Sequence, residues 1–488
     1  MSEAPKQTWE HQIAAIQYLK DHTVTCLTTK MGAGKSKMII EMLRAKGTVE
    51  TKRSVILCPK AVMSVWRGQF ATHAPGEFNV LILDGNENSS KKAEKIHHAL
   101  IQRAAGGQPL VVVVNYESAS IGTFVSMGQK KKKINVSSGK ISSVLCSTTW
   151  ETVTSDESQK LKGYNTQTSM WAWEFGNVCG SKVGMTGTLM PNSPMDVFGQ
   201  YRFLDERIFG KYITHFRNRY GIPDRNIPQK IKEWINQEEM SEKVNRIRYA
   251  VADDVLVLPE KQEIIIHVPL APAGLKAYRD MRKEAIAEIK RVRDDGEEFY
   301  KTAIAVNGGV KFLRLLQIAQ GYVRDDEGED IDVDTQKRKA LLELLEESMG
   351  EPVCVYAWFH HDMKCIQDCC SILGLRYGEL SGRQGRPRSC MNDHGEMAED
   401  IDVSGVQMKS GGSGINLTRS SIGIFMNTGM VSPGDYDQVQ ARQHRPGQTK
   451  NLRYYFLVTP GTVDETIARA RQEKRDVVDA ILNSEEFF

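Results

Sequence analysis

Residues 29–36 combine two glycines, two lysines and a serine in the order Thr-Lys-Met-Gly-Ala-Gly-Lys-Ser, between an apolar run and a helix-like segment. In a strand–loop–helix unit, glycines let backbone amides approach phosphate oxygens, and the N-terminus of the helix adds a positive dipole. We expect Lys35 to reach the outer phosphates of a nucleotide and Ser36 to hold Mg²⁺ through its hydroxyl. The alternative is a glycine-rich turn with a chance lysine.

A phosphate loop needs a carboxylate for the metal ion and a base that orients the attacking water. Asp156 and Glu157 follow a β-prone run that begins at residue 150. We expect Asp156 to bind the metal through water and Glu157 to polarise the nucleophilic water. An isolated acidic pair is more often a surface turn, so the prediction depends on its position after a strand and downstream of the loop.

Two arginines near the other end of the chain, Arg442 and Arg445, are three residues apart and share one face if that stretch is helical. Guanidinium groups that face a triphosphate stabilise the charge that develops in phosphoryl transfer, and such fingers typically contribute ~10³–10⁵ in rate. Because Lys35 and Glu157 lie in the first half of the chain, hydrolysis would then require two lobes to close. A solvated basic helix is the alternative.

Short apolar runs must supply the strands that position these residues. They alternate with helix-like stretches and are apolar on both faces, which is typical of buried parallel strands in a doubly wound α/β layer. The runs are 24–27, 54–58, 80–83, 110–114, 263–268, 353–357, 422–425 and 453–458. The segment from about 228 to 325 is instead rich in Glu, Lys, Arg and Leu at helical spacing. The fold class is therefore α/β, with two lobes around a mostly helical region.

Bulk properties exclude several classes of protein. The 488 residues are too many for one ordinary core, and 40% hydrophobic with 26% charged residues is typical of a globular chain. No apolar run is long enough to span a membrane, and the first residues lack the order of a secretory signal. Nine scattered cysteines favour a reducing, cytoplasmic setting. The net charge of +3 excludes a general polyanion-binding protein but not a local basic track.

The ordered set of motifs resembles the Swi/Snf-type ATPases of the superfamily 2 helicase-like motors. The similarity covers nearly the whole chain, and its most specific part is the Arg-x-x-Arg-x-Gly-Gln ending of residues 438–448. Other matching segments are 11–12, 29–36, 58–60 with Trp66, 156–159, 186–188, 410–417 and 461–465. The chain begins close to its first motif and ends soon after its last, so it resembles the compact phage or bacterial members rather than nucleosome remodellers.

The resemblance implies two RecA-like lobes, with an ATP-binding lobe at 1–225, a helical linker region at 226–330 and a second lobe at 331–488. It implies ATP and Mg²⁺ as the ligands. Residues expected to bind the nucleotide are Gln12, Thr29, Met31, Gly32, Ala33, Gly34, Lys35, Ser36, Gly414 and Gln438. Residues expected to couple hydrolysis to movement are Gln159, Thr186 and Thr188.

This sequence departs from the family pattern at several positions. Thr29 replaces the usual first glycine of the phosphate loop, and Gln159 stands where histidine is frequent, so an amide would link the acidic box to the coupling motif. Residues 189–192 and 431–434 also differ from the family. Residues 381–400 have no predicted role. Four cysteines of the second half, with His394, lack paired metal-ligand spacing and are interpreted as thiols.

Contacts with nucleic acid are expected from loops after strands, and they would reach the backbone rather than base edges. The candidates are Lys60, Asn115, Tyr116, Thr188, Lys409 and Ser410. The four consecutive lysines at 130–133 could also grip phosphates, although a solvated loop is an equal alternative.

These features predict a monomeric, nucleic-acid-stimulated ATPase that translocates on duplex DNA and remodels branched DNA or protein–DNA complexes. Two alternatives remain open. A strand-separating DNA or RNA helicase would carry a wedge hairpin, which the sequence does not reveal. A non-motor ATP-binding switch would have no need of motifs in a second lobe.

Overall fold

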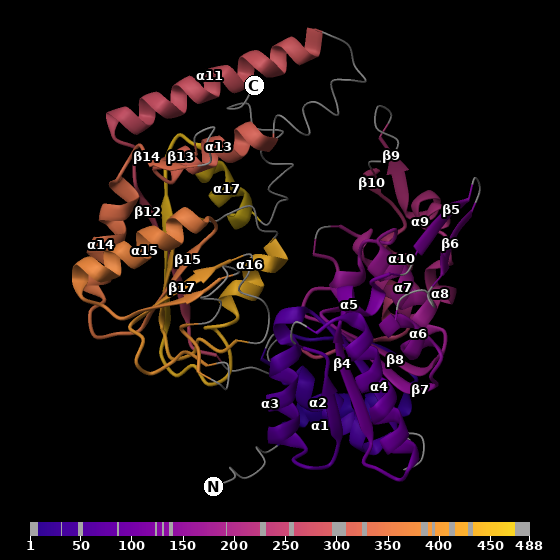
Figure 1. The fold of residues 1–488 in the computed structure, drawn as a ribbon. Coiled ribbons are helices and arrows are strands. Elements are labelled where there is room, and N and C mark those ends of the chain that lie inside the picture. The colour runs from indigo at the N-terminus through magenta and orange to yellow at the C-terminus, as the bar shows by residue number, and fades with distance from the viewer. Residues whose placement is uncertain are drawn as a thin grey trace. The chain divides into compact units, whose positions relative to one another are not determined.

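The computed structural model divides the chain into two compact units, residues 1–257 and 258–488. It describes residues 8–30, 32–46, 52–84, 87–122, 124–128, 131–135, 140–191, 193–224, 231–252, 258–294, 309–324, 329–381, 389–392, 396–408, 415–427 and 433–473. The fold class predicted from the sequence is confirmed, because each unit is built on a parallel sheet flanked by helices (Figure 1).

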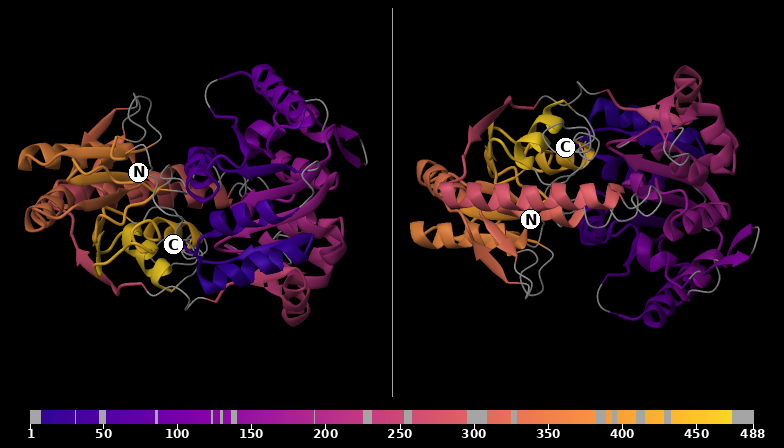
Figure 2. Two further views of the ribbon diagram at one scale, coloured as in Figure 1. Left: turned by 90° about the horizontal axis from the view of Figure 1, so that it is seen from below. Right: turned by 90° about the horizontal axis from the view of Figure 1, so that it is seen from above.

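The first unit is built on a seven-stranded parallel sheet with the order β11-β1-β8-β7-β2-β4-β3. Its strands are β1 (Val24–Thr28), β2 (Arg53–Cys58), β3 (Asn79–Ile82), β4 (Leu110–Asn115), β7 (Trp150–Asp156), β8 (Cys179–Thr186) and β11 (Arg248–Ala250). Every residue of β4 is buried, as expected when helices cover both faces of a sheet (Figure 2).

Helix α1 (Glu10–Asp21) precedes the first strand of this unit, and the other helices lie between strands along the chain. These are α2 (Lys35–Ala45), α3 (Met63–His73), α4 (Ser89–Ala104), α5 (Tyr116–Ser120), α6 (Lys140–Cys146), α7 (Gln167–Gly176), α8 (Asp196–Phe209), α9 (Ile213–Tyr220) and α10 (Gln237–Asn245), with 3₁₀ turns η1 (Lys60–Val62) and η2 (Ser158–Leu161). Two antiparallel hairpins stand outside the large sheet: β5 (Phe124–Gly128) with β6 (Lys131–Asn135), and β9 (Gly221–Pro223) with β10 (Ile231–Trp234).

The second unit has a six-stranded parallel sheet with the order β12-β19-β18-β15-β17-β16. Its strands are β12 (Lys261–His267), β15 (Val353–Ala357), β16 (Tyr377–Leu380), β17 (Val403–Gln407), β18 (Ile422–Phe425) and β19 (Leu452–Val458), and β13 (Tyr322–Arg324) pairs with β14 (Asp330–Asp332). Its helices are α11 (Pro272–Asp294), α13 (Gly309–Ala319), α14 (Gln336–Glu347), α15 (His360–Leu373), α16 (Pro433–Gln440) and α17 (Val463–Gln472).

Alternate residues of β15 enter two different apolar clusters of the second unit. Tyr356 belongs to one cluster, and Val353 and Val355 belong to the other. Because successive strand residues face opposite sides, this sheet is covered on both faces.

A buried ion pair ties α14 to α17 in the second unit. The Nζ atom of Lys337 donates to Asp464 Oδ2 at 2.6 Å, to Gln320 Oε1 at 3.0 Å and to the carbonyl of Met426 at 2.9 Å. Asp464 is fully buried and also accepts from the amide of Thr459. The pair therefore joins two helices and the end of β18.

The segment 226–330, expected as one helical region, contributes to both sheets. β11 pairs with β1 in the first unit, and β12 pairs with β19 in the second. The division into three domains therefore stays a prediction, while the structure separates at 257/258. Within the described residues, no helix has the length and apolar character that crossing a membrane requires.

Candidate nucleotide site

The carboxyl ends of three neighbouring strands gather the predicted catalytic residues of the first unit. β1, β8 and β7 are adjacent and parallel, with Thr28 opposite Thr186 and Asp156 opposite Met185. The amide of Thr29 donates to the carbonyl of Thr186 at 3.2 Å. Because parallel strands end at one edge of the sheet, the phosphate loop, the acidic pair and the coupling threonine converge there.

The phosphate loop has the backbone that its glycines permit. Gly32 and Gly34 have φ angles of 88° and 86°, in the left-handed region that favours glycine. Helix α2 begins directly at Lys35, whose Nζ donates to the carbonyl of Thr29 at 3.1 Å. A Cβ at position 34 would lie 2.3 Å from Gln12 Nε2. Met31 lies outside the described residues.

Gln12 holds the loop from helix α1. Its Nε2 donates to the carbonyl of Ala33 at 3.1 Å, and its Oε1 accepts from the amide of Trp9 at 3.2 Å. His11 Nε2 also lies 3.1 Å from the carbonyl of Ala33. The side chain of Gln12 is buried against the loop, and its expected reading of adenine stays a prediction.

Asp156 is a buried carboxylate held by an indole. Trp66 Nε1 donates to its Oδ2 at 3.0 Å. Burial, together with the adjacent Glu157 charge, raises the pKa of Asp156 to about 7, and Lys35 opposes this rise. An ionised carboxylate here is stabilised by a cation, so the position suits a metal ligand.

Trp66 and Tyr116 occupy the interior, although Tyr116 is one of the residues predicted to contact nucleic acid. Each side chain is only 1% exposed. The hydroxyl of Tyr116 donates to the carbonyl of Asp156 at 2.7 Å and lies 2.7 Å from Ser155 Oγ. A buried phenol offers no surface to nucleic acid, so we correct the assignment of Tyr116 to positioning the end of β7. The only sequence signal was an aromatic residue directly after a buried strand.

A chain of hydrogen bonds leads from Glu157 to the coupling motif. Gln159 Nε2 donates to Glu157 Oε2 at 2.7 Å, and Thr186 Oγ1 donates to Gln159 Oε1 at 2.7 Å. The amide of Thr188 donates to Thr186 Oγ1 at 3.0 Å. The amide of Gln159 therefore links Glu157 to Thr186.

Glu157 itself adopts a left-handed backbone with φ 54°, which is uncommon for a residue with a side chain. Such conformations cost of order 1–3 kcal/mol and gather at functional sites. The surrounding structure imposes this backbone, because Ser158 begins η2 and its Oγ donates to Gln200 Oε1 at 2.7 Å. The carboxylate is thereby held in one place.

The predicted arginine pair lies in turns, so the condition for a shared helical face is not met. Helix α16 ends at Gln440, and residues 441–447 form successive turns. Pro446 disfavours a helical backbone at the residue before it, Arg445. Arg442 is buried. Arg445 Nη1 donates to the carbonyl of Ile415 at 3.2 Å, and burial lowers the pKa of its guanidinium.

Two glutamines fix this turn segment to the second sheet. Gln443 Nε2 donates to Ser420 Oγ and to the carbonyl of Ile422, and its Oε1 accepts from Tyr356. Gln448 Nε2 donates to the carbonyl of Ser420 at 2.9 Å. The Arg442–Arg445 turns are therefore anchored at both ends.

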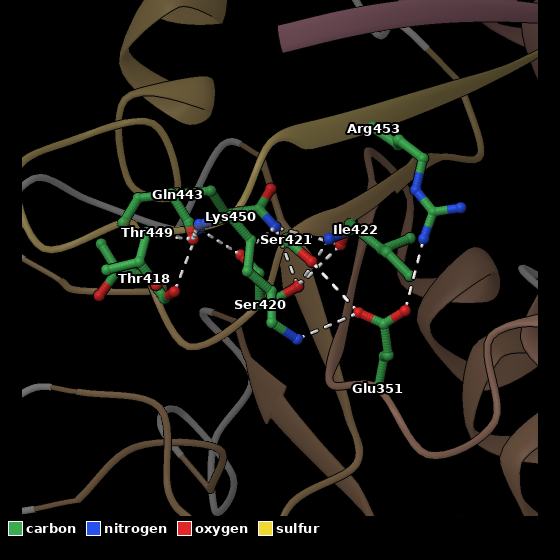
Figure 3. A network of polar contacts seen from close by, with 10 residues as sticks. Glu351, Thr418, Ser420, Ser421, Ile422, Gln443, Thr449, Lys450 and Arg453 are labelled. Atoms are coloured by element: carbon green, nitrogen blue, oxygen red, sulfur yellow. Dashed lines mark hydrogen bonds and ion pairs between the residues drawn. The ribbon is translucent and has the colours of Figure 1, made fainter. Parts of the chain in front are cut away.

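Figure 3 shows the polar network that surrounds these anchors. Glu351 pairs with Lys450 and with Arg453, each at 3.4 Å, and accepts from Ser421 Oγ. The segment after Gln448 is thus also tied to the turn before β15. Gln438 lies half-buried on α16, whereas Gly414, Lys409 and Ser410 lie outside the described residues.

The remaining candidates for nucleic-acid contact differ in exposure. Lys60 is exposed at the start of η1, and Thr188 is half-buried. Asn115 is buried, with its Nδ2 donating to Glu117 Oε2 at 3.0 Å. Within the described part of the chain, no cluster of three or more His, Cys, Asp or Glu residues is arranged to bind a metal ion.

Comparison with known proteins places these features in context. A family model described as the SNF2-related domain matches residues 11–311. An ATP-dependent helicase of Mycoplasma genitalium is 24% identical over 459 residues, which cover 93% of this chain and 40% of that protein. The protein p41 of Acyrthosiphon pisum secondary endosymbiont phage 1 is 24% identical over 363 residues, covering 69% and 73% of the two chains.

A solved structure, the Sulfolobus solfataricus SWI2/SNF2 ATPase core in complex with dsDNA, has a TM-score of 0.42 and 20% identity and covers 100% of this chain and 96% of that one. The chain spans less than half the length of the Mycoplasma helicase.

Proposed function

Since this chain belongs to the SNF2-related domain family, the Swi/Snf-type ATPases among the superfamily 2 helicase-like motors, we propose that it hydrolyses ATP to translocate on duplex DNA. The observation that carries the proposal is the hydrogen-bonded chain from Glu157 through Gln159 to Thr186. This chain joins Glu157, which is expected to orient the attacking water, to Thr186, which is expected to couple hydrolysis to movement along DNA. A protein that only bound ATP would have no need of such a link.

The phosphate loop fits a triphosphate. Left-handed glycines at 32 and 34 leave no side chain in the cradle, and the N-terminus of α2 follows directly. Backbone amides at a helix N-terminus bind phosphate oxygens. Lys35 donates a hydrogen bond to the carbonyl of Thr29 in this structure, and from this position it would pair with the outer phosphates.

Ser36 and Asp156 would hold Mg²⁺. The buried Asp156, whose pKa burial raises, is the kind of group that a divalent cation stabilises in its charged form. When bound, the ion neutralises charge on the outer phosphates. Trp66 and Tyr116 keep the carboxylate and its strand end fixed, so that less reorganisation is needed.

Glu157 would orient the attacking water, and Gln159 would hold its carboxylate. A shift of Glu157 would move the amide of Gln159, and this shift would reach Thr186 and then Thr188 through their hydrogen bonds. Arg442 and Arg445 would stabilise the charge that develops on the transferred phosphoryl group. These roles are proposals that rest on the chemistry of each side chain.

Remodelling of branched DNA or of protein–DNA complexes would be the output of such a motor. We expect Lys60 and Thr188 to contact the DNA backbone, which implies little sequence preference. The Mycoplasma genitalium relative is named as an ATP-dependent helicase, and this name supports the proposal that the chain uses ATP.

The decisive experiment compares ATP hydrolysis with no nucleic acid, duplex DNA, single-stranded DNA and RNA. We expect duplex DNA to raise kcat most, and Lys35→Ala to abolish hydrolysis in every case. Equal, low rates under all four conditions would favour the nucleotide switch. Stronger stimulation by single strands, together with displacement of a strand from a forked duplex, would favour the helicase.

A further inference from the structure

Residues 389–392 and 396–398 form a short antiparallel pair in the second unit, within the segment for which the sequence predicts no role. Met391 pairs with Met397. Met397 is only 3% exposed and belongs to an apolar cluster of the second unit, and Cys390 is fully buried in the same cluster. The short antiparallel pair is therefore part of the folded core.

The pair is bonded to residues 415–417, which precede β18. Glu396 and Asn416 form a parallel bridge, and the amide of Met397 donates to the carbonyl of Asn416 at 3.0 Å. The pair is also tied to β16, because Ser389 Oγ accepts from the backbone of that strand at 2.7 Å. The backbone of Glu396 is therefore held against two neighbouring parts of the sheet.

Residues 415–417 also bind the arginine turns. The amide of Leu417 donates to the carbonyl of Arg442 at 2.9 Å, and Arg445 Nη1 donates to the carbonyl of Ile415 at 3.2 Å. Arg445 and Glu396 are thus bonded to two consecutive residues of the chain. This arrangement brings a carboxylate close to a guanidinium that is expected to face a triphosphate.

The charges of these two side chains interact. Burial lowers the pKa of the Arg445 guanidinium, and the carboxylate of Glu396 opposes this shift. Arg445 is half-buried and Glu396 is exposed, so solvent weakens the interaction. A carboxylate in this place stabilises the arginine while phosphates are absent, and it repels phosphates that approach the arginine.

We propose that Glu396 is a positioning residue whose carboxylate is the resident counter-charge of Arg445 and competes with the outermost phosphate of ATP for this arginine. The inference rests on the proposed function and adds a residue that lies outside the family motifs of this chain. Glu396 would act through Arg445, so its charge would set how tightly the protein binds ATP.

The test measures nucleotide binding by the full chain in the presence of Mg²⁺, with a non-hydrolysable ATP analogue and with ADP. Glu396→Gln keeps the size of the side chain and removes its charge. We expect the Kd for the ATP analogue to fall about two- to fivefold, which is the range of a partly exposed charge interaction. The Kd for ADP should change less, because ADP lacks the phosphate that the arginines are expected to face.

Glu399→Gln is the matched control. Glu399 is exposed three residues further along, and its backbone carbonyl, not its carboxylate, accepts from Arg419 Nη2 at 2.8 Å. The control changes the net charge equally and should leave the Kd for both nucleotides unchanged. Both variants should melt like the parent, because each replaced side chain is exposed and the bridge from Glu396 to Asn416 is made by the backbone.

Arg445→Gln tests which residue Glu396 acts on. In the Arg445→Gln background, adding Glu396→Gln should lower the Kd for the ATP analogue much less than it does in the parent, because the opposing charge is gone. An equal gain with and without Arg445 would overturn the inference, and so would an equal gain for the ATP analogue and ADP.

The outcomes separate this inference from the proposed function. If the parent protein binds no ATP, or if duplex DNA fails to stimulate its hydrolysis, the proposed function is wrong. If the parent binds ATP and responds to duplex DNA, but Glu396→Gln binds the ATP analogue as the parent does, the inference on Glu396 is wrong and the motor proposal stands.

Discussion

Glu157 is the residue on which the proposed chemistry depends most directly. Its left-handed backbone and its hydrogen bond from Gln159 fix the carboxylate in one orientation. A fixed base contributes more than a mobile one because its position requires no reorganisation during reaction. A left-handed backbone costs of order 1–3 kcal/mol, and the 3₁₀ turn that follows Glu157 is packed through the buried Ser158 and Leu161.

Replacing Glu157 by Gln should leave ATP binding intact and slow hydrolysis. The amide keeps the shape of the side chain but cannot accept a proton, and general base catalysis typically contributes about 10²–10⁴ in rate. Single-turnover hydrolysis and nucleotide titration would measure the two effects. Glu151→Gln, near the start of the same strand, is the control and should hydrolyse at nearly the parental rate. Parental turnover in Glu157→Gln would mean that another residue orients the water.

A buried carboxyl group, that of Asp362, should make the stability of the second unit depend on pH. Asp362 is buried, and its Oδ2 accepts from the amide of Phe359 and from Asn427 Nδ2. Burial raises its pKa to about 6. Protonation therefore stabilises the folded unit. This contribution is complete below the ordinary pKa of about 3.9 and is lost as pH rises through 6.

Between about pH 7.5 and about pH 5, the parent should gain on the order of 1 kcal/mol of stability that Asp362→Asn does not gain. Thermal melting of the two proteins at both pH values measures the difference. Asp402→Asn is the control, because Arg376 lowers the pKa of Asp402 and this carboxyl therefore stays ionised over the whole pH range, so the variant should keep the parental pH dependence. Identical pH dependence in the parent and Asp362→Asn would show that the carboxyl does not titrate in this range.

At the scale of elements, much of the fold could be predicted because buried parallel strands have continuous apolar runs. The run 353–357 coincides with β15, and the runs for β1, β2, β4 and β19 differ by a residue or so at their ends. The phosphate loop was also found, since its chemistry is local to a few consecutive residues.

Other elements had no such signal. β8, β16 and β17 contain glycine and polar residues, which have low strand propensity and are held in place by their neighbours in the sheet. For the four lysines at 130–133, the sequence leaves a phosphate-gripping segment and a solvated loop as equal alternatives, and neither predicts the strands β5 and β6. The burial of Trp66 and Tyr116 depends on contacts between strands far apart in sequence, which periodicity cannot reveal.

The junction of α1 with the phosphate loop yields a prediction at this scale. Gly34→Ala would place a Cβ 2.3 Å from Gln12 Nε2 and would also hold alanine in a left-handed backbone. The backbone term alone costs roughly 1–2 kcal/mol. We therefore expect ATP affinity to fall more than tenfold, as measured by nucleotide titration.

Gly76→Ala is a control that separates the effect of the left-handed backbone from the effect of the close contact with Gln12. Gly76 has φ 72°, but a Cβ there would meet no atom within 4 Å. The free energy of unfolding of this variant should fall by a similar roughly 1–2 kcal/mol because of the left-handed alanine, and its ATP affinity should stay unchanged. Equal ATP affinities in the two variants would mean that the contact with Gln12 does not shape the loop.

At the scale of the whole molecule, the chain comprises two units with separate cores. Each is large enough to unfold as a cooperative body. The buried Lys337–Asp464 pair lies wholly within the second unit, so its removal should distinguish the two in a thermal scan.

Lys337→Met would leave Asp464 buried without its cation, and breaking such a pair typically costs about 3–5 kcal/mol. By calorimetry of the full chain, we expect the transition of the second unit to fall on the order of 10 °C while that of the first unit stays in place. Adding Asp464→Asn should recover part of the loss. A simultaneous shift of both transitions would show that the units unfold as one.

The edge strand β11 is hydrogen-bonded to the strand that leads into the phosphate loop. Arg248 Nε donates to Thr28 Oγ1 at 2.8 Å, and the amide of Val251 donates to the carbonyl of Thr28 at 2.9 Å. Thr28 directly precedes the phosphate loop, and Val251 precedes the boundary with the second unit by only a few residues. A displacement of β11 would therefore reach the residue before the phosphate loop directly, through these two hydrogen bonds, without passing through a helix.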